Sequence, residues 1–323
     1  MKKTLIASAI AAATFSASAL AADNMPTVYG NIQYALAHDN FDGGPSTVDH
    51  FDNGSTLGVK HSHEIAPGLE GFFKLELDGF DADDKTKGRG RVRLDEAYIG
   101  VKGDSFGKIW VGSDDSLYER KIDQIANFYE VATISIGGSY STGEGDLIQY
   151  ETPSFGGLTL GAAVQVNGDV ENAEKSYPYQ LAAAYEMGGV ELALAMDSND
   201  NHDGNAENTY GLRAAYGADS FTVSAEYQTR KDAYDVAGLM GVYTIGANQF
   251  ALSYELATAD DANDTERDTV TLQALHNVSD NMYVYFEGYL GGGDEVYSYT
   301  DSQGNTASTD ERSIASVGAV YYF

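Results

Sequence analysis

The sequence predicts an all-β fold, specifically a sixteen-stranded antiparallel transmembrane β-barrel. From Thr27 onward, runs of about ten residues alternate apolar and polar side chains, and turn residues separate the runs. The connections alternate between short turns and longer acidic stretches. No later run reaches the roughly 18 consecutive apolar residues that indicate a membrane-spanning helix. Together these observations favour strands that cross a membrane.

The N-terminal residues predict a secretory signal peptide. Two lysines near the start precede a short apolar run, Leu5–Ala17, and an Ala-Leu-Ala cleavage pattern ends at Ala21. We expect residues 1–21 to be removed and residues 22–323 to form the barrel domain. The chain has no cysteine, so an exported protein of this sequence relies on burial and backbone pairing rather than disulfides.

Each predicted strand has one apolar and one polar face. In FTVSAEYQ (Phe221–Gln228), Phe, Val, Ala and Tyr share one side, while Thr, Ser, Glu and Gln share the other. The last strand alternates in the same way and ends on the aromatic residue Phe323. We expect strands near residues 27–37, 54–64, 68–80, 90–102, 106–113, 145–153, 156–166, 177–187, 189–198, 207–217, 219–229, 235–246, 248–258, 266–277, 280–291 and 310–322.

The turns between these strands distinguish a membrane barrel from a soluble β-sandwich. Residues 65–67 and 103–105 are short turns, whereas residues 38–53 and 293–310 are long and acidic. A sandwich also alternates apolar and polar faces, but strands of this length with such unequal turns are typical of outer-membrane barrels. In lipid, strands can pair every backbone N–H and C=O only if the sheet closes into a barrel. A barrel of sixteen strands encloses a water-filled lumen.

The charge balance is strongly acidic. The chain has 49 Asp and Glu against 19 Lys and Arg, a formal charge of −30. This excess excludes a nucleic-acid partner, which requires basic patches. It provides either solubility in a salty medium or a negative field that concentrates cations.

One long irregular segment interrupts the strands. The stretch KIWVG (Lys108–Gly112) is strand-like, but the acidic SDDSLYERKIDQ follows, and no strand resumes until about Gly145. Long loops of this kind in compact proteins are uncommon and usually functional.

The ordered phrases of the chain resemble the general diffusion porins of the Gram-negative outer membrane. The matching phrases are VYGNIQYAL (Val28–Leu36), STLGVKHS (Ser55–Ser62), GLEGFFKLEL (Gly68–Leu77), DEAYIGVKGDSFGKIWVGS (Asp95–Ser113), IQYETPSFGGLTLGAAVQ (Ile148–Gln165) and the terminal VGAVYYF. The resemblance implies a non-enzymatic homotrimer that passes ions and small hydrophilic solutes by diffusion. It also implies short periplasmic turns, long external loops and a third loop, residues 114–144, that folds inward and narrows the pore. Its implied surroundings are outer-membrane lipid and lipopolysaccharide.

The sequence departs from that family where its pore wall is basic. Asn31, Thr56 and Ser113 occupy three positions that are basic in the family, and all three are neutral. Strand alternation places Lys60 and Lys74 on the same face as Thr56 and Glu76, but leaves the orientation of residues 90–102 open. The expected pore wall comprises Asn31, Thr56, Lys60, Lys74, Glu76, Arg91, Arg93 and Ser113.

The loop side of the expected constriction is mostly acidic. Its charged residues are Asp114, Asp115, Glu119, Arg120, Lys121, Asp123 and Glu130. Acidic groups in a narrow pore offset the hydration that a cation loses, and rings of acid make cation pores. We therefore expect cation preference. The alternatives are a substrate-specific channel and a non-transport adhesion or structural barrel.

The remaining polar groups give weaker signals. His61 and His63 lie on one side of a strand, but no third metal ligand accompanies them, so a rim pair is favoured over a metal site. NDNHDG (Asn199–Gly204) faintly resembles a calcium loop, yet Tyr210 stands where a bidentate glutamate is needed. No histidine has the Ser and Asp partners of a hydrolase. We expect no cofactor beyond loose divalent-cation binding by the acidic loops.

Overall fold

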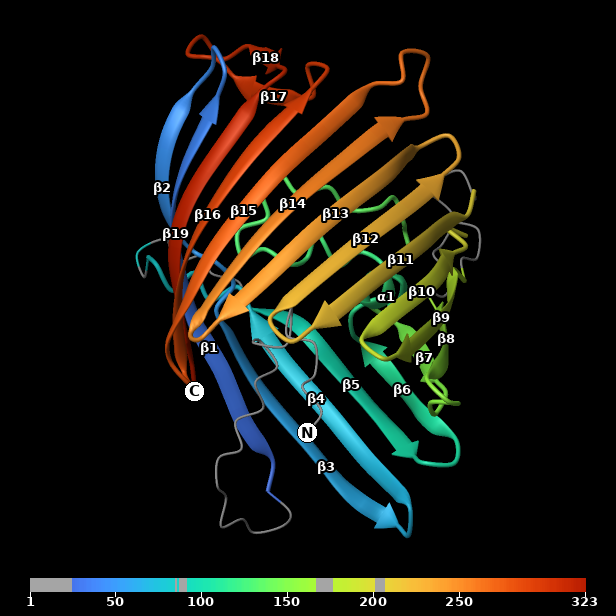
Figure 1. Ribbon diagram of the computed structural model, residues 1–323. Coiled ribbons are helices and arrows are strands. Elements are labelled where there is room, and N and C mark those ends of the chain that lie inside the picture. Colours follow the sequence, from blue (N-terminus) through green and yellow to red (C-terminus); the bar gives the residue numbers. More distant parts are fainter. Residues whose placement is uncertain (1–24, 85, 87–91, 167–176, 201–206) are drawn as a thin grey trace, which may run out of the picture.

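The computed structural model describes residues 25–84, 86, 92–166, 177–200 and 207–323, so the expected signal peptide lies outside the described residues. The described chain forms one antiparallel barrel with a small hairpin at its long-loop end (Figure 1). Its strands are β1 (Thr27–Phe41), β2 (Ser46–Asp52), β3 (Thr56–Ala66), β4 (Leu69–Asp78), β5 (Arg93–Gly103), β6 (Gly107–Ser113), β7 (Leu147–Glu151), β8 (Leu158–Gln165), β9 (Tyr179–Met187), β10 (Val190–Asp197), β11 (Thr209–Ala218), β12 (Phe221–Arg230), β13 (Tyr234–Ile245), β14 (Asn248–Ala259), β15 (Glu266–Ser279), β16 (Met282–Gly293), β17 (Tyr297–Thr300), β18 (Thr306–Thr309) and β19 (Arg312–Tyr322). The helix α1 spans Leu117–Lys121.

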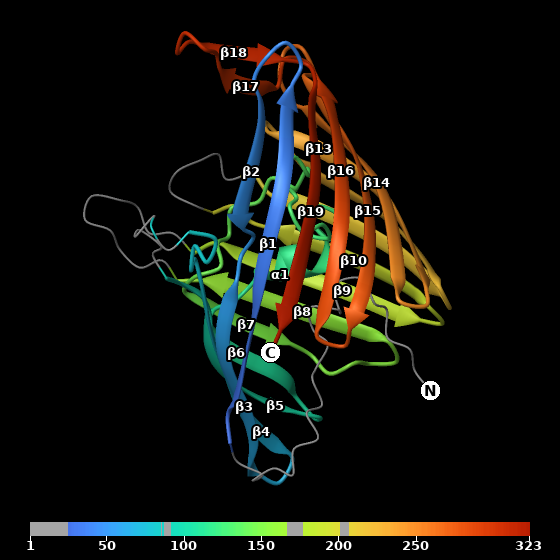
Figure 2. The ribbon, with the colours of Figure 1, turned by 90° about the vertical axis from the view of Figure 1, so that its left-hand side faces the viewer.

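The sheet closes on itself between the first and last barrel strands. Each strand pairs with its neighbours in sequence, and β1 pairs with β19 from Asn31↔Tyr322 to Phe41↔Arg312 (Figure 2). On its other edge β1 pairs first with β3 and then with β2. Because β2 and β3 continue each other along β1, they form one barrel strand, and the closed barrel has sixteen strands.

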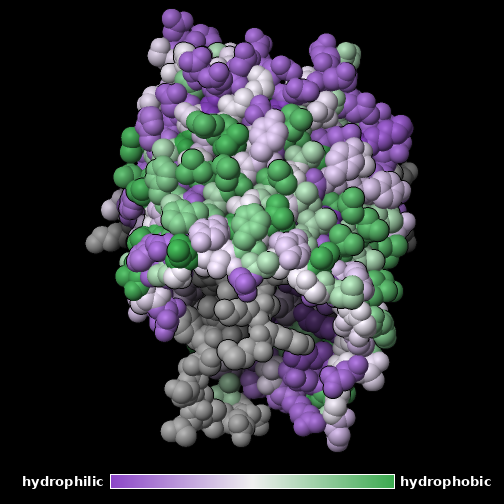
Figure 3. Space-filling view, viewed as in Figure 1, coloured by the Kyte–Doolittle hydropathy of each residue, from purple (hydrophilic) through white to green (hydrophobic). Residues whose placement is uncertain are grey.

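The two faces of the barrel differ as the sequence alternation predicts. Apolar side chains such as Leu239, Leu252 and Leu290 are more than half exposed on the outside. They contribute to a hydrophobic band between hydrophilic ends (Figure 3). Lumen-facing positions on the same strands carry small or polar groups, including Ser253 and Glu287. An outer surface this apolar is stable only against lipid. No helix in the described part of the chain is long and apolar enough to cross a membrane.

Two predicted loops contain additional strands. The first external connection was expected to be irregular over residues 38–53, but β1 continues to Phe41 and β2 begins at Ser46. The last external connection contains the hairpin β17–β18. Both segments are short and rich in polar residues, so the long apolar alternation that marks barrel strands is not evident in them.

The segment after β6 lies inside the barrel. In Figure 1 it is the green chain behind β11–β16. Leu117, Tyr118 and Ile122 pack against alanines of β8, β9 and β10. Small residues on this part of the wall leave the space that α1 occupies. At Gly211, an added Cβ would lie 2.5 Å from the Tyr118 hydroxyl oxygen and 2.7 Å from an Ile122 methyl carbon.

Replacing this wall glycine should displace α1 while the barrel stays intact. Overpacking of a tight contact costs about 1–3 kcal/mol. In Gly211→Val, we expect faster hydrogen–deuterium exchange in residues 115–125 and unchanged exchange in β1 and β19. Gly241→Val is the matched control, because a Cβ there has its nearest neighbour at 3.9 Å. Equal exchange in the two variants would show that the loop does not depend on this contact.

Candidate functional site

The inward loop, residues 114–146, follows one side of the barrel wall and returns. It leaves β6, packs α1 against β8–β10, and reaches β16 at residues 130–131. On the way back, the Ile134 carbonyl accepts a hydrogen bond from the Thr269 hydroxyl at 2.8 Å, and the Thr142 hydroxyl donates to Asp197 at 2.9 Å. The loop therefore covers the wall from β8 to β16. We call the remaining lumen, between the loop and the wall of β1–β6, the passage.

Two wall glutamates hold the loop by its backbone. Glu226 on β12 accepts from the amides of residues 124–125 at 3.2 and 3.4 Å. Glu287 on β16 accepts from the amides of residues 130–131 at 2.8 and 3.0 Å. Both carboxyl groups are buried, so they supply acceptors to loop amides that are shielded from water. These acids position the loop rather than line the passage.

The loop root is a network centred on Asp114. Its carboxylate accepts from Trp110 Nε1 at 2.6 Å and from Arg120 Nη1 at 2.9 Å. Arg120 also donates to the Gln149 amide oxygen at 2.7 Å. Asp114 is only 7% exposed, so its charge is balanced by Arg120 and directed into the protein. Of the two adjacent aspartates, Asp115 is the one exposed to the passage.

A second buried aspartate holds the two arms of the loop together. Asp123 is 3% exposed and accepts from Gln228 Nε2 at 3.0 Å, the Tyr140 hydroxyl at 3.2 Å and the Gly138 amide at 3.3 Å. The carboxylate thus bridges the outgoing arm, the returning arm and β12. Its placement gives it a positioning role, although the sequence grouped it with the exposed loop acids.

Titration of the loop acids is shifted by their surroundings. Burial, reinforced by Asp115 and Glu144, raises the pKa of Glu119 to about 7. Burial likewise raises the pKa of Glu130 to about 7, although a hydrogen bond from Tyr283 at 2.7 Å opposes the shift. The pKa of Asp115 is raised by desolvation inside the barrel, where water is limited even around an exposed side chain, and by the neighbouring Asp114.

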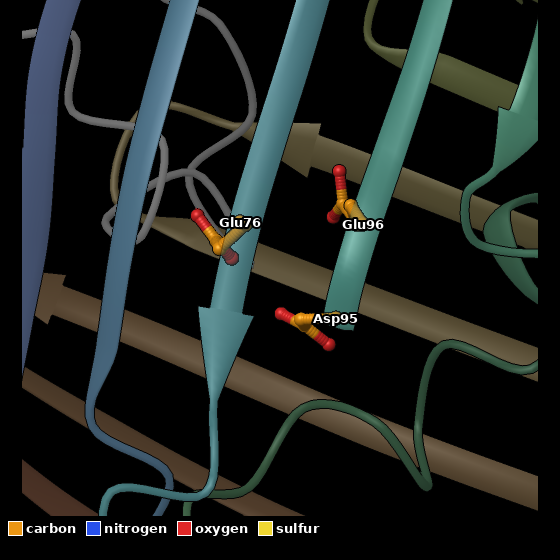
Figure 4. Close-up of side chains that lie close together, drawn as sticks. All are labelled: Glu76, Asp95 and Glu96. Atoms are coloured by element: carbon orange, nitrogen blue, oxygen red, sulfur yellow. The ribbon is translucent and has the colours of Figure 1, made fainter. Parts of the chain in front are cut away.

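Carboxylates also line the wall that faces the loop. Glu76 on β4 and the pair Asp95 and Glu96 on β5 offer oxygens within 4.8 Å of one another (Figure 4). Lys74 Nζ lies 2.6 Å from Glu96 and 3.8 Å from Glu76, so the chain itself supplies one cation to this cluster.

A β-bulge explains why two consecutive acids share the lumen. The register shifts between Leu75↔Ala97 and Leu77↔Leu94, so Asp95 and Glu96 together oppose Glu76. This settles the orientation that strict alternation leaves open. Leu94 and Ala97 flank the pair, and Leu94 is 52% exposed on the outer face.

The remaining wall residues lie as follows. Asn31 Nδ2 donates to the Thr56 hydroxyl at 3.0 Å, so these neutral positions bond to each other across β1 and β3. Lys60 Nζ lies 4.8 Å from the Tyr29 ring centroid on the same face. The roles of these residues in conduction stay predictions.

One expected wall residue is placed differently, and two other expected site residues form ion pairs. Ser113 pairs with Ala97 and lies on the same face of β6 as the outward-facing Val111. Its side chain therefore points away from the lumen and does not belong to the pore wall. Arg93 Nη2 lies 2.9 Å from Asp78, and Lys121 Nζ lies 3.0 Å from Glu151. Arg91 lies outside the described residues.

An aromatic cluster surrounds Lys108, and no local pattern in the sequence predicts it. Its Nζ is 3.9 Å from the Trp110 ring centroid, 5.1 Å from Phe72 and 5.6 Å from Tyr98. These rings come from β4, β5 and β6, and alternation places each on the lumen face. The rings can be predicted to meet only when the alternation of side chains is combined with the pairing register of the three strands.

The histidine pair lies on the outside of β3. His61 and His63 stack with ring centroids 5.2 Å apart, and both side chains are on the outward parity near the short-turn end. Of the calcium-like stretch, residues 201–204 lie outside the described residues.

Comparison with known proteins decides the family. The family model described as Gram-negative porin matches residues 7–295. The chain belongs to the Gram-negative porins. A monosaccharide porin of a Halomonas species is 31% identical, with 89% of this chain and 94% of the relative covered. The major outer membrane protein of Halomonas elongata matches over the same shares with the same identity.

Solved porin structures share the fold. An anion-selective porin from Comamonas acidovorans superposes with a TM-score of 0.73 at 17% identity, covering 93% of this chain and all of that one. The Salmonella typhi OmpF complex with daunomycin gives 0.71 at 18% identity, covering 93% and 98%. The protein is therefore a non-enzymatic channel of the outer membrane, with short periplasmic turns and long external loops.

Removing the charge of Glu287 should weaken its hold on the part of the inward loop that it binds, residues 128–134. Glu287→Gln keeps the shape but weakens bonds that the carboxylate accepts from residues 130–131. Hydrogen bonds to charged groups contribute about 1.5–3 kcal/mol each. We expect faster amide exchange in residues 128–134 and noisier single-channel current. Glu70→Gln, in a partly exposed ion pair, is the control. Unchanged exchange in residues 128–134 would contradict the anchoring role.

Proposed function

We propose that this porin is a general diffusion channel that prefers cations. The observation that carries the proposal is acid on both sides of the passage. On the loop, Asp115 is exposed and the partly buried Glu119 lies near it, and on the wall Glu76, Asp95 and Glu96 lie together.

Two of the bases near this passage are paired with acids, whereas Lys60 and Lys108 lie over aromatic rings. Lys74 binds Glu96 and Arg120 binds Asp114, with N–O distances of 2.6 and 2.9 Å. At an effective dielectric near 20, two unit charges 4 Å apart interact by about 4 kcal/mol. The unpaired carboxylates therefore favour a partly dehydrated cation over an anion.

The Halomonas relative makes passage of monosaccharides the second candidate. Sugars stack on open aromatic faces, and four lumen rings lie on β1 and β4–β6: Tyr29, Phe72, Tyr98 and Trp110. Lysine ammonium groups lie over these rings, which favours a general pore. Saturable block of the potassium current by glucose would instead support the sugar-specific channel.

The expected partners also belong to this proposal. Homotrimer formation, contact with lipopolysaccharide and loose divalent-cation binding by the external acidic loops follow from the family and the charge. They leave the selectivity argument unchanged, because it rests on groups inside one barrel.

Reversal potentials under a KCl gradient test the cation preference. The double variant Asp95→Asn with Asp115→Asn removes one exposed charge from each side of the passage. We expect the potassium-to-chloride permeability ratio to fall roughly fivefold, corresponding to ~1 kcal/mol. Asp280→Asn, in an exposed periplasmic turn, should leave the ratio unchanged. Anion preference in the unmodified channel would overturn the proposal.

The selectivity should also depend on pH near neutrality. Glu119 has a pKa of about 7, so its carboxyl is mostly neutral at pH 6 and mostly charged at pH 8. The permeability ratio should therefore rise over this interval, where ordinary carboxylates are already ionised. Glu119→Gln should remove at least half of the rise. A pH profile identical in the variant would exclude Glu119 from the passage.

A further inference from the structure

The periplasmic mouth of the channel contains a pocket of about 750 Å³. The periplasmic ends of β3–β7 and the adjoining turns line it; these strand ends lie in the lower part of Figure 1. Its volume is within the range of small-molecule sites, about 300–1,000 Å³. Its charged lining residues are Glu64, Glu70, Lys102, Asp104, Lys108 and Glu151.

Four of these charges form one row across neighbouring strands. Glu70 pairs in register with Lys102, Lys102 with Lys108, and Lys108 with Glu151. The order is therefore acid, base, base, acid. Like charges directly opposite each other destabilise a sheet, and Lys102 and Lys108 form such a pair.

Lys108 is the member of the row without an acidic partner. Lys102 Nζ binds Glu70 at 3.0 Å, and Glu151 binds Lys121 at 3.0 Å. Among the described residues, the Lys108 ammonium has no ion pair and is surrounded by aromatic rings. These rings hold the ammonium by cation–π attraction, while Asp114 and Glu151 act on it only as nearby charges without a direct ion pair.

We propose that this pocket binds small zwitterionic solutes of the amino-acid kind. The solute carboxylate lies between the ammonium groups of Lys102 and Lys108 and separates their charges. The solute ammonium lies against Glu151 or Glu70 at the end of the row. The proposal uses only the pocket and is independent of the cation preference of the constriction.

The charge pattern of the pocket favours a zwitterion over a simple anion or a sugar. Four carboxylates line it against two ammonium groups, so a bare carboxylate solute adds to an acidic surplus. A neutral sugar places no charge between Lys102 and Lys108. A zwitterion matches the base-next-to-acid order without changing the net charge.

Current block in planar bilayers tests this site. The full channel is measured in about 0.1 M KCl, where charges separated by more than ~10 Å are screened. L-Serine, L-serine methyl ester, lactate and glycerol are added in turn on the periplasmic side. The ester lacks the carboxylate, lactate lacks the ammonium and glycerol lacks both. We expect L-serine to reach half-block at a concentration at least threefold below that of any other probe.

Substitution of Lys108 tests whether this residue causes the block by serine. Lys108→Met keeps the length of the side chain and should raise the half-blocking serine concentration about tenfold, whereas Lys108→Arg should retain the block. Lys231→Met, in an exposed external segment, is the matched control. Lys102→Met provides a second test if Lys108→Met does not assemble. Equal block in the Lys108→Met and unmodified channels, or lactate or glycerol blocking as well as serine, would overturn the proposal.

Discussion

The structure depends on the requirement that backbone amides and carbonyls at membrane depth are paired. For strands this requirement is met only by closure, and the β1–β19 ladder provides it. A closed barrel of sixteen strands is too wide for its own side chains to fill. The chain narrows the lumen with an irregular loop, and the amides of that loop need acceptors in turn. The need to pair backbone groups therefore determines both the closed barrel wall and the position of the inward loop.

The acceptors that the wall supplies are carboxylates and amides. Glu226 and Glu287 each receive two consecutive loop amides, and Gln180 receives the amide of Tyr118 at 3.0 Å. Acidity in this protein therefore has two separate uses. Buried acids fix the position of the loop, while exposed acids such as Asp115 face the solute. Total charge alone does not distinguish these uses.

The sequence predicts the strands well because their alternation is a local property. Each of the sixteen expected segments overlaps a barrel strand, whereas β2, which extends one of those strands, and the hairpin β17–β18 are rich in polar residues and are not predicted. The candidate site was less predictable. Whether Asp114 or Asp115 faces the passage depends on Trp110, and the surroundings of Lys108 depend on the register of three strands. Such contacts arise only when distant segments meet, so no local pattern reports them.

The bulge on β5 has a consequence for how the pore can change in evolution. Insertions and deletions are normally confined to loops, because one residue gained or lost in a strand reverses every side chain beyond it. At Asp95 and Glu96 the extra residue is absorbed, and both carboxylates stay in the lumen. A single-codon deletion there would remove one lumen charge and leave the rest of the strand in register. The charge of the pore can therefore change in evolution through loss of one residue at this bulge as well as through substitution.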